Sequence, residues 1–571
     1  MNVNIEVARI LYEIGELYAI KGESFRSRAY VVAAQRIESL TDDIRSVYEQ
    51  GKLREIPSVG KNIAFVIEEY LETGGRSHLE KLRDSLPSGA RELMALEGIG
   101  PRTIMKLFHE LNVASINQLE KAARSGEIRK LKGFGPKSEK NVLQAIEEHR
   151  GFQKRFLLGQ ILPVVREIEE YMSSCRAVLQ VDFAGSARRM KETVGDLDIL
   201  VASEREGEAV EHFVSMPRVT RVISKGSTRS TIIIGSNLQI DLRAVPPKSY
   251  GSALQYFTGS KEHNIKLRTL AVKLGYKLNE YGLFRRKDNK KIAGETEESV
   301  YQTLGLEYVE PELREDRGEI EAAIEGSLPD LVEYNNVRGD LHVHSSWSDG
   351  NAELEEIAER AQQLGLEYVA ICDHSKSLGI ARGLDENRLK DQMREIERLN
   401  KNFEGFKLLK GIEVDIMADG CLDLKNSVLK DLDFVVASIH SGFKSGAEKL
   451  TERMISAIHN EYVSTIGHPT GRLIQRRHPY PLDLKKVLSV AADQRVMMEI
   501  NAFPNRLDLN DVNSEAAMEQ GISMSIGTDA HTLGQLKYLP LGVSVARRGW
   551  LQPKNVANTL HVKELLIKIS R

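Results

Sequence analysis

The sequence predicts a multidomain protein with an all-helical N-terminal region, a central α+β part and a C-terminal barrel of alternating strands and helices. Three observations support this prediction. A turn of apolar residues and glycine recurs three times in a helical first quarter, acidic and apolar residues alternate in two strand-like runs of the middle, and apolar runs beyond residue 340 end in histidine or carboxylate side chains. A chain of 571 residues is also too long for one hydrophobic core, which favours three or four domains.

The composition excludes some classes of protein. Basic and acidic residues number 79 and 82, so no global field indicates a nucleic-acid partner and any DNA contact must come from local patches. The three cysteines are far apart and lack metal-finger spacing, which is typical of a reducing cytosol. No apolar run is long enough to span a membrane, and no signal pattern opens the chain. We therefore expect a soluble, cytoplasmic protein.

The first 150 residues show helical periodicity and a repeated turn. The turn occurs at 56–60, 96–100 and 131–135, and each copy is followed by a polar helix start. One copy alone could equally be an ordinary turn between helices, but three copies indicate a duplicated unit. Such a turn presents backbone N–H groups to a DNA phosphate without reading bases, and an excess of lysine and arginine surrounds the third copy. This pattern resembles the helix-hairpin-helix motif.

We expect two helical domains here, residues 1–85 with the first motif and residues 86–150, the fingers, with the other two. The predicted DNA contacts are the turn glycines and two lysines at helix starts: Gly60, Lys61, Gly98, Gly100, Gly133, Gly135 and Lys137.

The central part carries acidic residues on two strand-like runs. A strand's period of two puts Asp196 and Asp198 on one face, and the run 238–245 repeats the alternation with Asp241. Carboxylates on one face repel one another unless a cation lies between them, and hard oxygen ligands favour Mg²⁺ or Mn²⁺. Either fragment alone is more often a solvated strand end, but three convergent carboxylates predict a two-metal phosphoryl-transfer site.

A turn upstream of these strands predicts an anion site. Gly185 and Ser186 follow a mostly apolar run, where a strand could turn into a helix, and Arg188 and Arg189 come next. Backbone N–H groups and arginines in such a turn suit a phosphate.

These motifs resemble the nucleotidyltransferase superfamily. The segment Tyr256-Phe257-Thr258-Gly259-Ser260, followed by Asn264 and Arg268, resembles the nucleotide-binding stretch of family X DNA polymerases, the group of DNA polymerase beta. The similarity extends from the N-terminus to about residue 315. It implies a catalytic palm at 151–250, a thumb at 251–315, and gapped or primer-template DNA and dNTPs as partners of a monomer.

The resemblance also implies roles for single residues. Asp196 and Asp198 would bind both metal ions, and Asp241 the ion that activates the primer 3′-hydroxyl. The nucleotide would be bound by Ser186, Arg189 and Gly195 at the triphosphate, by Tyr256 and Phe257 beside the sugar, and by Asn264 and Arg268 over the nascent base pair. Gly259 would be a further nucleotide contact. Lys261 replaces an acidic residue of polymerase beta, so nucleotide affinity at that place cannot be transferred.

One family activity lacks its residue. In relatives with 5′-deoxyribose-phosphate lyase activity, the Schiff-base lysine lies six residues beyond the last glycine of the first hairpin, where this chain has Val66. Valine has no amine to attack an aldehyde. We therefore expect the lyase to be absent or moved, and Lys61 to be a phosphate contact.

The C-terminal part, after an expected linker at 316–335, is rich in potential metal ligands. Nine of the fourteen histidines lie beyond residue 340, and most of them end apolar strand-like runs separated by helical stretches. A β/α barrel with its site at the C-terminal ends of the strands would produce this pattern. A lone histidine is more often a satisfied core residue, but the repetition favours ligands.

Residues 336–571 resemble the PHP domain of polymerases and histidinol phosphatases, a distorted (β/α)7 barrel. The resemblance assigns three divalent ions, Zn²⁺ or Mn²⁺, to nine residues. The first ion would be held by His342, His344, Glu413 and Asp529, the second by Glu413, His440 and His468, and the third by Asp349, His374 and His531. Asp340 and Asp373 would orient imidazoles from behind.

The expected function is that of a gap-filling DNA repair polymerase with a metal-dependent 3′-to-5′ exonuclease and an abasic-site nuclease in the same chain. Two alternatives remain open at this point. A nucleotidyltransferase could act on another acceptor while the PHP domain is purely structural, or the chain could be a DNA-binding scaffold with relict sites.

Overall fold

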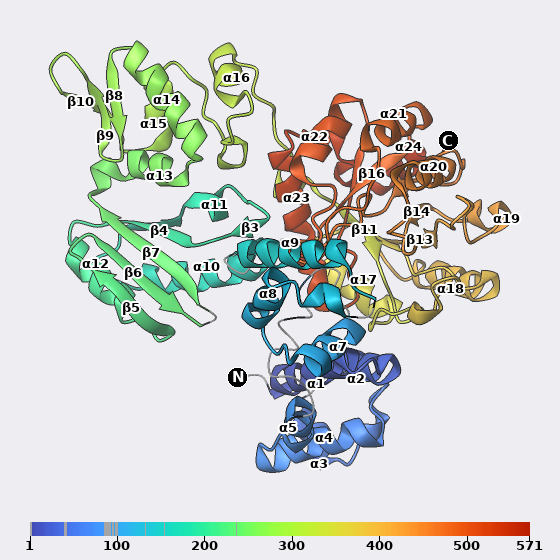
Figure 1. The fold of residues 1–571 in the computed structure, drawn as a ribbon. Helices are drawn as coiled ribbons and strands as arrows, with labels where there is room; N and C mark the ends of the chain where they lie inside the picture. The colour runs from blue at the N-terminus through green and yellow to red at the C-terminus, as the bar shows by residue number, and fades with distance from the viewer. Residues whose placement is uncertain are drawn as a thin grey trace.

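The computed structural model describes residues 3–38, 43–84, 93, 96, 101–131, 133–152, 155–235 and 237–570. The N-terminal helices lie at the bottom of Figure 1, the palm and thumb on the left and the barrel on the right. None of the described helices is long and apolar enough to cross a membrane.

The N-terminal region is helical, as its periodicity predicts. Its elements are α1 (Val3–Ile20), α2 (Ser24–Glu38), α3 (Ile44–Glu49), η1 (Leu53–Glu55), α4 (Lys61–Thr73), α5 (Ser77–Asp84), α7 (Pro101–Leu111), α8 (Ile116–Arg124), η2 (Ile128–Lys130) and α9 (Pro136–Phe152). One hydrophobic core, which includes the fully buried Leu11, Ile67 and Leu119, runs through all of these helices from α1 to α9.

The palm is a sheet covered by helices on one face. Its elements are β1 (Phe156–Leu157), α10 (Leu158–Ser173), β2 (Gln180–Phe183), α11 (Gly185–Arg188), β3 (Thr193–Val194), β4 (Leu197–Ala202), α12 (Glu206–Val214), β5 (Val219–Lys225), β6 (Arg229–Ile234) and β7 (Leu238–Val245). The five-stranded sheet has the order β2-β4-β7-β6-β5, with β4 and β7 parallel. The apolar residues of β4 and β7 pack with α10 and α12 in the core, so their acidic residues lie on the opposite face.

The thumb continues the chain without a break. It consists of η3 (Pro247–Ser249), α13 (Tyr250–Thr258), α14 (Lys261–Lys273), β8 (Tyr276–Asn279), β9 (Gly282–Arg285), β10 (Lys291–Ala293), α15 (Glu297–Thr303) and η4 (Pro311–Leu313). The expected linker contains α16 (Glu319–Glu325) and ends within η5 (Tyr334–Asn336).

The C-terminal part is a seven-stranded parallel barrel, as predicted. Its strands lie in sequence order: β11 (Gly339–Val343), β12 (Tyr368–Ile371), β13 (Lys407–Asp415), β14 (Phe434–Ser438), β15 (Thr465–Ile466), β16 (Met497–Asn501) and β17 (Met524–Gly527). A parallel bridge between Val343 and Ala530 brings the first strand beside the last. The α-helices around it are α17 (Leu354–Gln363), α18 (Glu386–Leu399), α19 (Asn426–Leu429), α20 (Ala447–Ile458), α21 (Leu484–Gln494), α22 (Asp511–Glu519), α23 (Leu539–Arg548) and α24 (Val562–Ile569).

The barrel packs tightly against the palm. The buried apolar residues of the two parts form one continuous cluster. At Gly159 on α10, a β-carbon would lie 2.8 Å from Pro504 and 3.2 Å from Leu541 of the barrel. The barrel also touches the N-terminal helices, because the side chain of Asn351 donates to the backbone carbonyl of Gln35 on α2 at 3.3 Å.

Candidate metal centres

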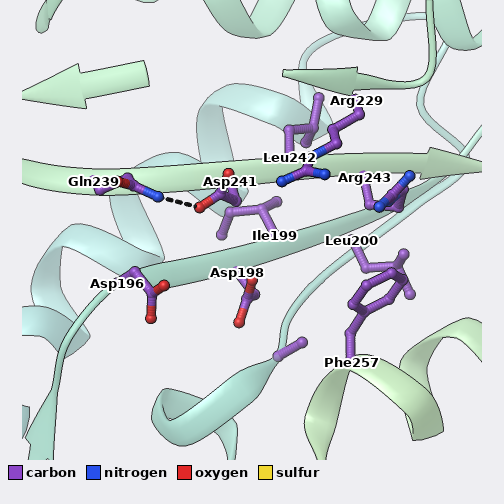
Figure 2. Close-up of a pocket in the computed structure, with 11 residues that line it drawn as sticks. Asp196, Asp198, Ile199, Leu200, Arg229, Gln239, Asp241, Leu242, Arg243 and Phe257 are labelled. Atoms are coloured by element: carbon purple, nitrogen blue, oxygen red, sulfur yellow. Dashed lines mark hydrogen bonds between the residues drawn. The ribbon is translucent and has the colours of Figure 1, made fainter. Parts of the chain in front are cut away.

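The first centre is built by the two parallel strands of the palm. Asp198 on β4 lies directly opposite Asp241 on β7 in the strand register, and Asp196 immediately precedes β4. Figure 2 shows the three carboxylates close together, on the face of the sheet opposite α10 and α12 and beside the helix that carries Phe257. The alternation of acidic and apolar residues places them there, because every second side chain of a strand points to the same face.

The surroundings of the three carboxylates differ. Burial raises the pKa of Asp198 to about 7, and the negative charges of Asp196 and Asp241 add to this effect. Asp241 accepts hydrogen bonds from the Thr231 hydroxyl at 2.5 Å and from the Gln239 amide at 2.7 Å. A buried carboxylate beside two others is stabilised in its charged form by a cation, so this donor set fits hard divalent ions.

A cavity of about 390 Å³ opens beside these residues. The three aspartates line it together with Arg229, Arg243 and Phe257, and the Arg243 guanidinium lies 5.3 Å from the centre of the Phe257 ring. Sequence reasoning missed Gln239, Arg229 and Arg243, although Gln239 and Arg243 lie two residues either side of Asp241 on the strand. Carboxylates and arginines in one cavity can bind metal ions and an anion at the same time.

Gly185 brings the turn that the sequence predicts to bind an anion against the carboxylates. Its φ of +60° lies in the left-handed region, and a β-carbon there would be 2.5 Å from the Asp198 Oδ2 atom. Only glycine fits this combination. Ser186 follows in the first turn of α11.

Arg189 lies where the turn meets the thumb. Its Nε atom donates to Glu315 at 3.0 Å, and its Nη1 atom donates to the Thr258 carbonyl. Gly259, whose φ is +70°, would place a β-carbon 3.0 Å from the Arg189 guanidinium. The guanidinium is therefore held between the palm and the end of α13.

The other predicted nucleotide contacts form a small network on the thumb. Asn264 donates from its side chain to the Tyr256 carbonyl at 2.7 Å and accepts from Gln255 at 2.7 Å, and the exposed Arg268 donates to the Asn264 carbonyl at 3.1 Å. The cavity lining contains Phe257 but does not include these predicted contacts: Ser186, Arg189, Gly195, Tyr256, Gly259, Asn264 and Arg268.

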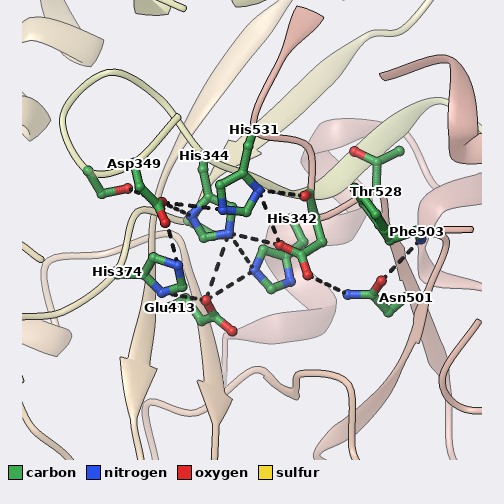
Figure 3. A network of polar contacts seen from close by, with 12 residues as sticks. His342, His344, Asp349, His374, Glu413, Asn501, Phe503, Thr528 and His531 are labelled. Carbon is green, nitrogen blue, oxygen red and sulfur yellow. Dashed lines mark hydrogen bonds and ion pairs between the residues drawn. The ribbon is translucent and has the colours of Figure 1, made fainter. Parts of the chain in front are cut away.

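The second centre lies at the C-terminal ends of the barrel strands. Figure 3 shows imidazoles from several strands converging with Asp349 and Glu413. Three groups have ligand atoms within 4.8 Å of one another: His344, Asp349, His374 and His531; His342, His344 and Asp529; and His374, Glu413 and His440. His468 joins through its Nε2 atom, 3.0 Å from Glu413. All nine residues that the sequence singled out are therefore brought together.

The chemistry of this cluster fits several cations. The Nδ1 atoms of His344 and His440 are buried and have no hydrogen-bond partner among the described residues, although each is an atom that can bind a metal ion. Burial raises the pKa of Glu413, but the charges of His440, His374 and His342 outweigh it and hold the pKa well below its usual range.

The residues that support the metal ligands of the barrel form contacts that differ from those expected. Asp340 accepts from the backbone N–H groups of His342 and Thr528 at 3.2 and 3.0 Å, and Asp373 accepts from the Ser345 N–H at 2.9 Å. Within the described part of the chain, neither forms a hydrogen bond to an imidazole; both fix the backbone that carries the ligands. Glu499, which sequence reasoning missed, contacts the His342 Nδ1 atom at 2.7 Å.

The predicted DNA contacts are only partly within the described structure. Gly60 caps α4, Gly133 has a φ of +88°, and Gly135 lies at the start of α9, with open space around each. Lys61 and Lys137 are exposed on the first turns of α4 and α9. Gly98 and Gly100 lie outside the described residues. Val66, at the place of the lyase lysine, is buried.

Comparison with known families divides the chain in the same way. Residues 2–76 match the helix-hairpin-helix domain family, 90–148 the SAM-like helix-hairpin-helix tandem family, 253–315 the DNA polymerase beta thumb family and 340–502 the PHP domain family.

Comparison with known proteins covers the whole chain. The DNA polymerase/3′-5′ exonuclease PolX of Bacillus subtilis is 38% identical over 98% of each chain. A probable phosphatase of Thermoanaerobacter sp. (strain X514) is 31% identical over 38% of this chain and 89% of its own. Rat DNA polymerase lambda is 25% identical over 55% of this chain and 56% of its own. The chain therefore belongs to the family X DNA polymerases, in the group that carries helix-hairpin-helix domains, a polymerase beta thumb and a C-terminal PHP domain.

Proposed function

We propose that this chain fills short gaps in DNA during repair by adding dNTPs to a primer 3′-hydroxyl. The observation that carries the proposal is the pairing of Asp198 with Asp241 in parallel register, with Asp196 on the same face, in a cavity that also contains two arginines. Asp196, Asp198 and Asp241 would hold Mg²⁺ or Mn²⁺. Such ions, when bound, lower the pKa of the attacking hydroxyl and neutralise charge on the phosphates.

The chain's own residues would position the substrates around these carboxylates. The Thr231 and Gln239 hydrogen bonds hold the Asp241 carboxylate, which would face the primer terminus. Ser186, Arg189 and Gly195 would bind the triphosphate, and Tyr256, Phe257 and Gly259 would surround the sugar. Asn264 and Arg268 would lie over the base pair, while Gly60, Lys61, Gly133, Gly135 and Lys137 would contact DNA phosphates. We propose that the working protein is a monomer.

The PHP centre would trim 3′ ends. The nine clustered residues would hold three ions, Zn²⁺ or Mn²⁺, and ions bound there would supply Lewis acidity towards water and towards a phosphate. The relative PolX of Bacillus subtilis is described as a polymerase and a 3′-5′ exonuclease, which supports DNA as the substrate of this centre. Cleavage at abasic sites is a second reaction of the same phosphodiester chemistry.

A primer assay on gapped DNA, with and without dNTPs, tests both halves. Asp198→Ala is expected to abolish extension and to keep 3′ trimming, whereas His374→Ala is expected to do the reverse. Loss of both activities in either variant would show that the centres are not independent. Extension of an RNA or small-molecule acceptor in place of gapped DNA would favour a nucleotidyltransferase that acts on another acceptor. Unchanged DNA degradation by His374→Ala would indicate that the role of the barrel is structural.

A further inference from the structure

A buried arginine of the barrel reaches the nucleotide side of the palm. Arg548, at the end of α23, is 3% exposed. Its Nη1 atom donates to the backbone carbonyl of Arg189 at 2.6 Å and to the Glu315 carboxylate at 3.1 Å, and its Nη2 atom donates to Asp511 at 2.6 Å. One side chain of the barrel therefore bonds both to Arg189 and to the carboxylate that holds the Arg189 guanidinium.

We propose that Arg548 is a positioning residue for nucleotide binding, which fixes Arg189 and neutralises Glu315 so that Arg189 can bind a triphosphate. The inference rests on the function proposed above, because it deepens the role given there to Arg189. It assigns to the PHP barrel a part in the polymerase reaction that is separate from its own metal centre.

The charges in this cluster explain why Arg548 is needed. Glu315 accepts from the Arg189 Nε atom at 3.0 Å and lies 3.6 Å from the Lys191 ammonium. Its side chain is 15% exposed. Burial raises the pKa of Glu315, but Arg548 and Arg189 outweigh it and lower the pKa. Without Arg548, Glu315 would keep its charge with Arg189 as its main partner, and would compete with the triphosphate for the same guanidinium.

The backbone around Arg189 is held by the barrel at a second point. Arg472 of the barrel donates to the Glu192 carboxylate at 2.6 Å. Glu192 lies three residues after Arg189 and four before Asp196. The apolar core is continuous across the same boundary. A segment fixed at both ends by a packed domain loses little conformational entropy when a ligand binds, which favours affinity.

The neighbouring residue provides a matched control. Arg547 lies on the same helix, is 5% exposed and donates to Glu312 at 2.7 Å and to the Val332 carbonyl at 3.2 Å. Its loss removes a buried ion pair between the barrel and Glu312 at the end of the thumb, whereas the polar contacts of Arg547 within the described residues do not include Arg189 or Glu315. Arg548→Met therefore removes contacts to Arg189 and Glu315, whereas Arg547→Met leaves these two residues with their partners.

The test is steady-state primer extension on gapped DNA by the full-length chain, with KM for the dNTP and kcat measured separately. Arg548→Met is expected to raise KM about tenfold or more, as the loss of a charge-assisted hydrogen bond implies, with kcat changed much less. Arg548→Lys keeps the charge but loses the fork that bonds three acceptors, so its KM should rise less. The double variant Arg548→Met/Glu315→Gln should recover part of the lost affinity, since the competing carboxylate is gone.

The outcomes separate this inference from the proposed function. The positioning role would be overturned if the Arg548→Lys and Arg548→Met variants, shown to be folded by thermal unfolding, both kept the wild-type KM. It would also be overturned if Arg547→Met raised KM as much as Arg548→Met does. Should Arg548→Met fail to fold, the Arg548→Lys variant and its double variant with Glu315→Gln still decide the matter. If Arg189→Ala leaves KM unchanged, the triphosphate role of Arg189 itself falls, and the inference falls with it.

Discussion

Replacing Gly185 by alanine would test whether the close approach of the turn to the carboxylates determines polymerase activity. A β-carbon at this position would lie 2.5 Å from the Asp198 Oδ2 atom, whereas ordinary van der Waals contacts begin at 3.4 Å, so the carboxylate or the turn must move by as much as about 0.9 Å to restore one. The left-handed φ of +60° adds a cost of about 1–2 kcal/mol for any residue with a β-carbon.

The shift would act on the reacting atoms directly. Asp198 faces Asp241 across the strand pair, and a displacement approaching 1 Å in such a site lowers rates by about 100-fold. We expect Gly185→Ala to reduce kcat for primer extension by about that factor and stability by about 1–2 kcal/mol, while 3′ trimming by the barrel is retained. Single-turnover extension on gapped DNA and urea unfolding measure the two effects.

The matched control is Gly207→Ala. Gly207 lies on α12 of the same domain, with no atom near its β-carbon position and no left-handed φ. Alanine there should leave extension unchanged and gain up to about 1 kcal/mol of stability, since alanine favours a helix. The reasoning would be refuted if Gly185→Ala extended primers as fast as the Gly207→Ala variant.

Three further predictions test other parts of the structure. Glu499→Gln is expected to weaken metal binding by the barrel about 10-fold to 100-fold, because the Glu499 carboxylate contacts the Nδ1 atom of His342 and so orients this imidazole. Metal analysis after dialysis against a graded series of chelator concentrations measures the effect. The substitution Glu448→Gln, at an exposed residue of the barrel, is the control. Glu297→Gln tests the buried ion pairs of the thumb: burial raises the pKa of Glu297, but Arg314 and Arg188 outweigh it and lower the pKa from 4.5 to about 2. The carboxylate therefore contributes about 3 kcal/mol above pH 5, and the stability difference from wild type in urea unfolding should shrink as the pH falls from about 5 to about 2; a difference independent of pH would contradict this. Because Val66 offers no amine and is buried, borohydride treatment with a 5′-deoxyribose-phosphate end should trap no adduct, and a strong adduct lost in Lys61→Ala would show that the lyase has moved.

The periodic features of the molecule could be predicted from the sequence. The acidic alternation around Asp198 and Asp241 predicted two strands with carboxylates on one face, and the recurring apolar runs that end in ligands predicted the barrel. In both cases a local pattern has a direct structural reading, because the strand period fixes which side chains share a face. The ligand set of the barrel could be assembled because each member ends a strand at the same edge of the barrel.

Contacts that depend on tertiary packing could not be predicted. Glu499 lies in an ordinary apolar strand, and nothing local indicates that its carboxylate meets His342. Asp340 and Asp373 lie beside ligands in sequence and were therefore expected to orient imidazoles, but they accept hydrogen bonds from backbone N–H groups, from hydroxyl groups and, at Asp373, from the Gln392 amide. No sequence feature distinguishes Arg548 from the other arginines of the chain, and its contact with Arg189 forms only when the barrel packs against the palm.

Glu413 has a consequence for how the barrel takes up its ions. Its two carboxylate oxygens lie within 4 Å of the imidazoles of five histidines, His342, His344, His374, His440 and His468, at 3.6, 3.8, 2.8, 3.2 and 3.0 Å. One carboxylate cannot be oriented towards several cations independently, and cations that share its single negative charge repel one another. Loading of the centre should therefore be coupled, so that each bound ion changes the affinity for the next and the saturation curve differs from that of separate sites.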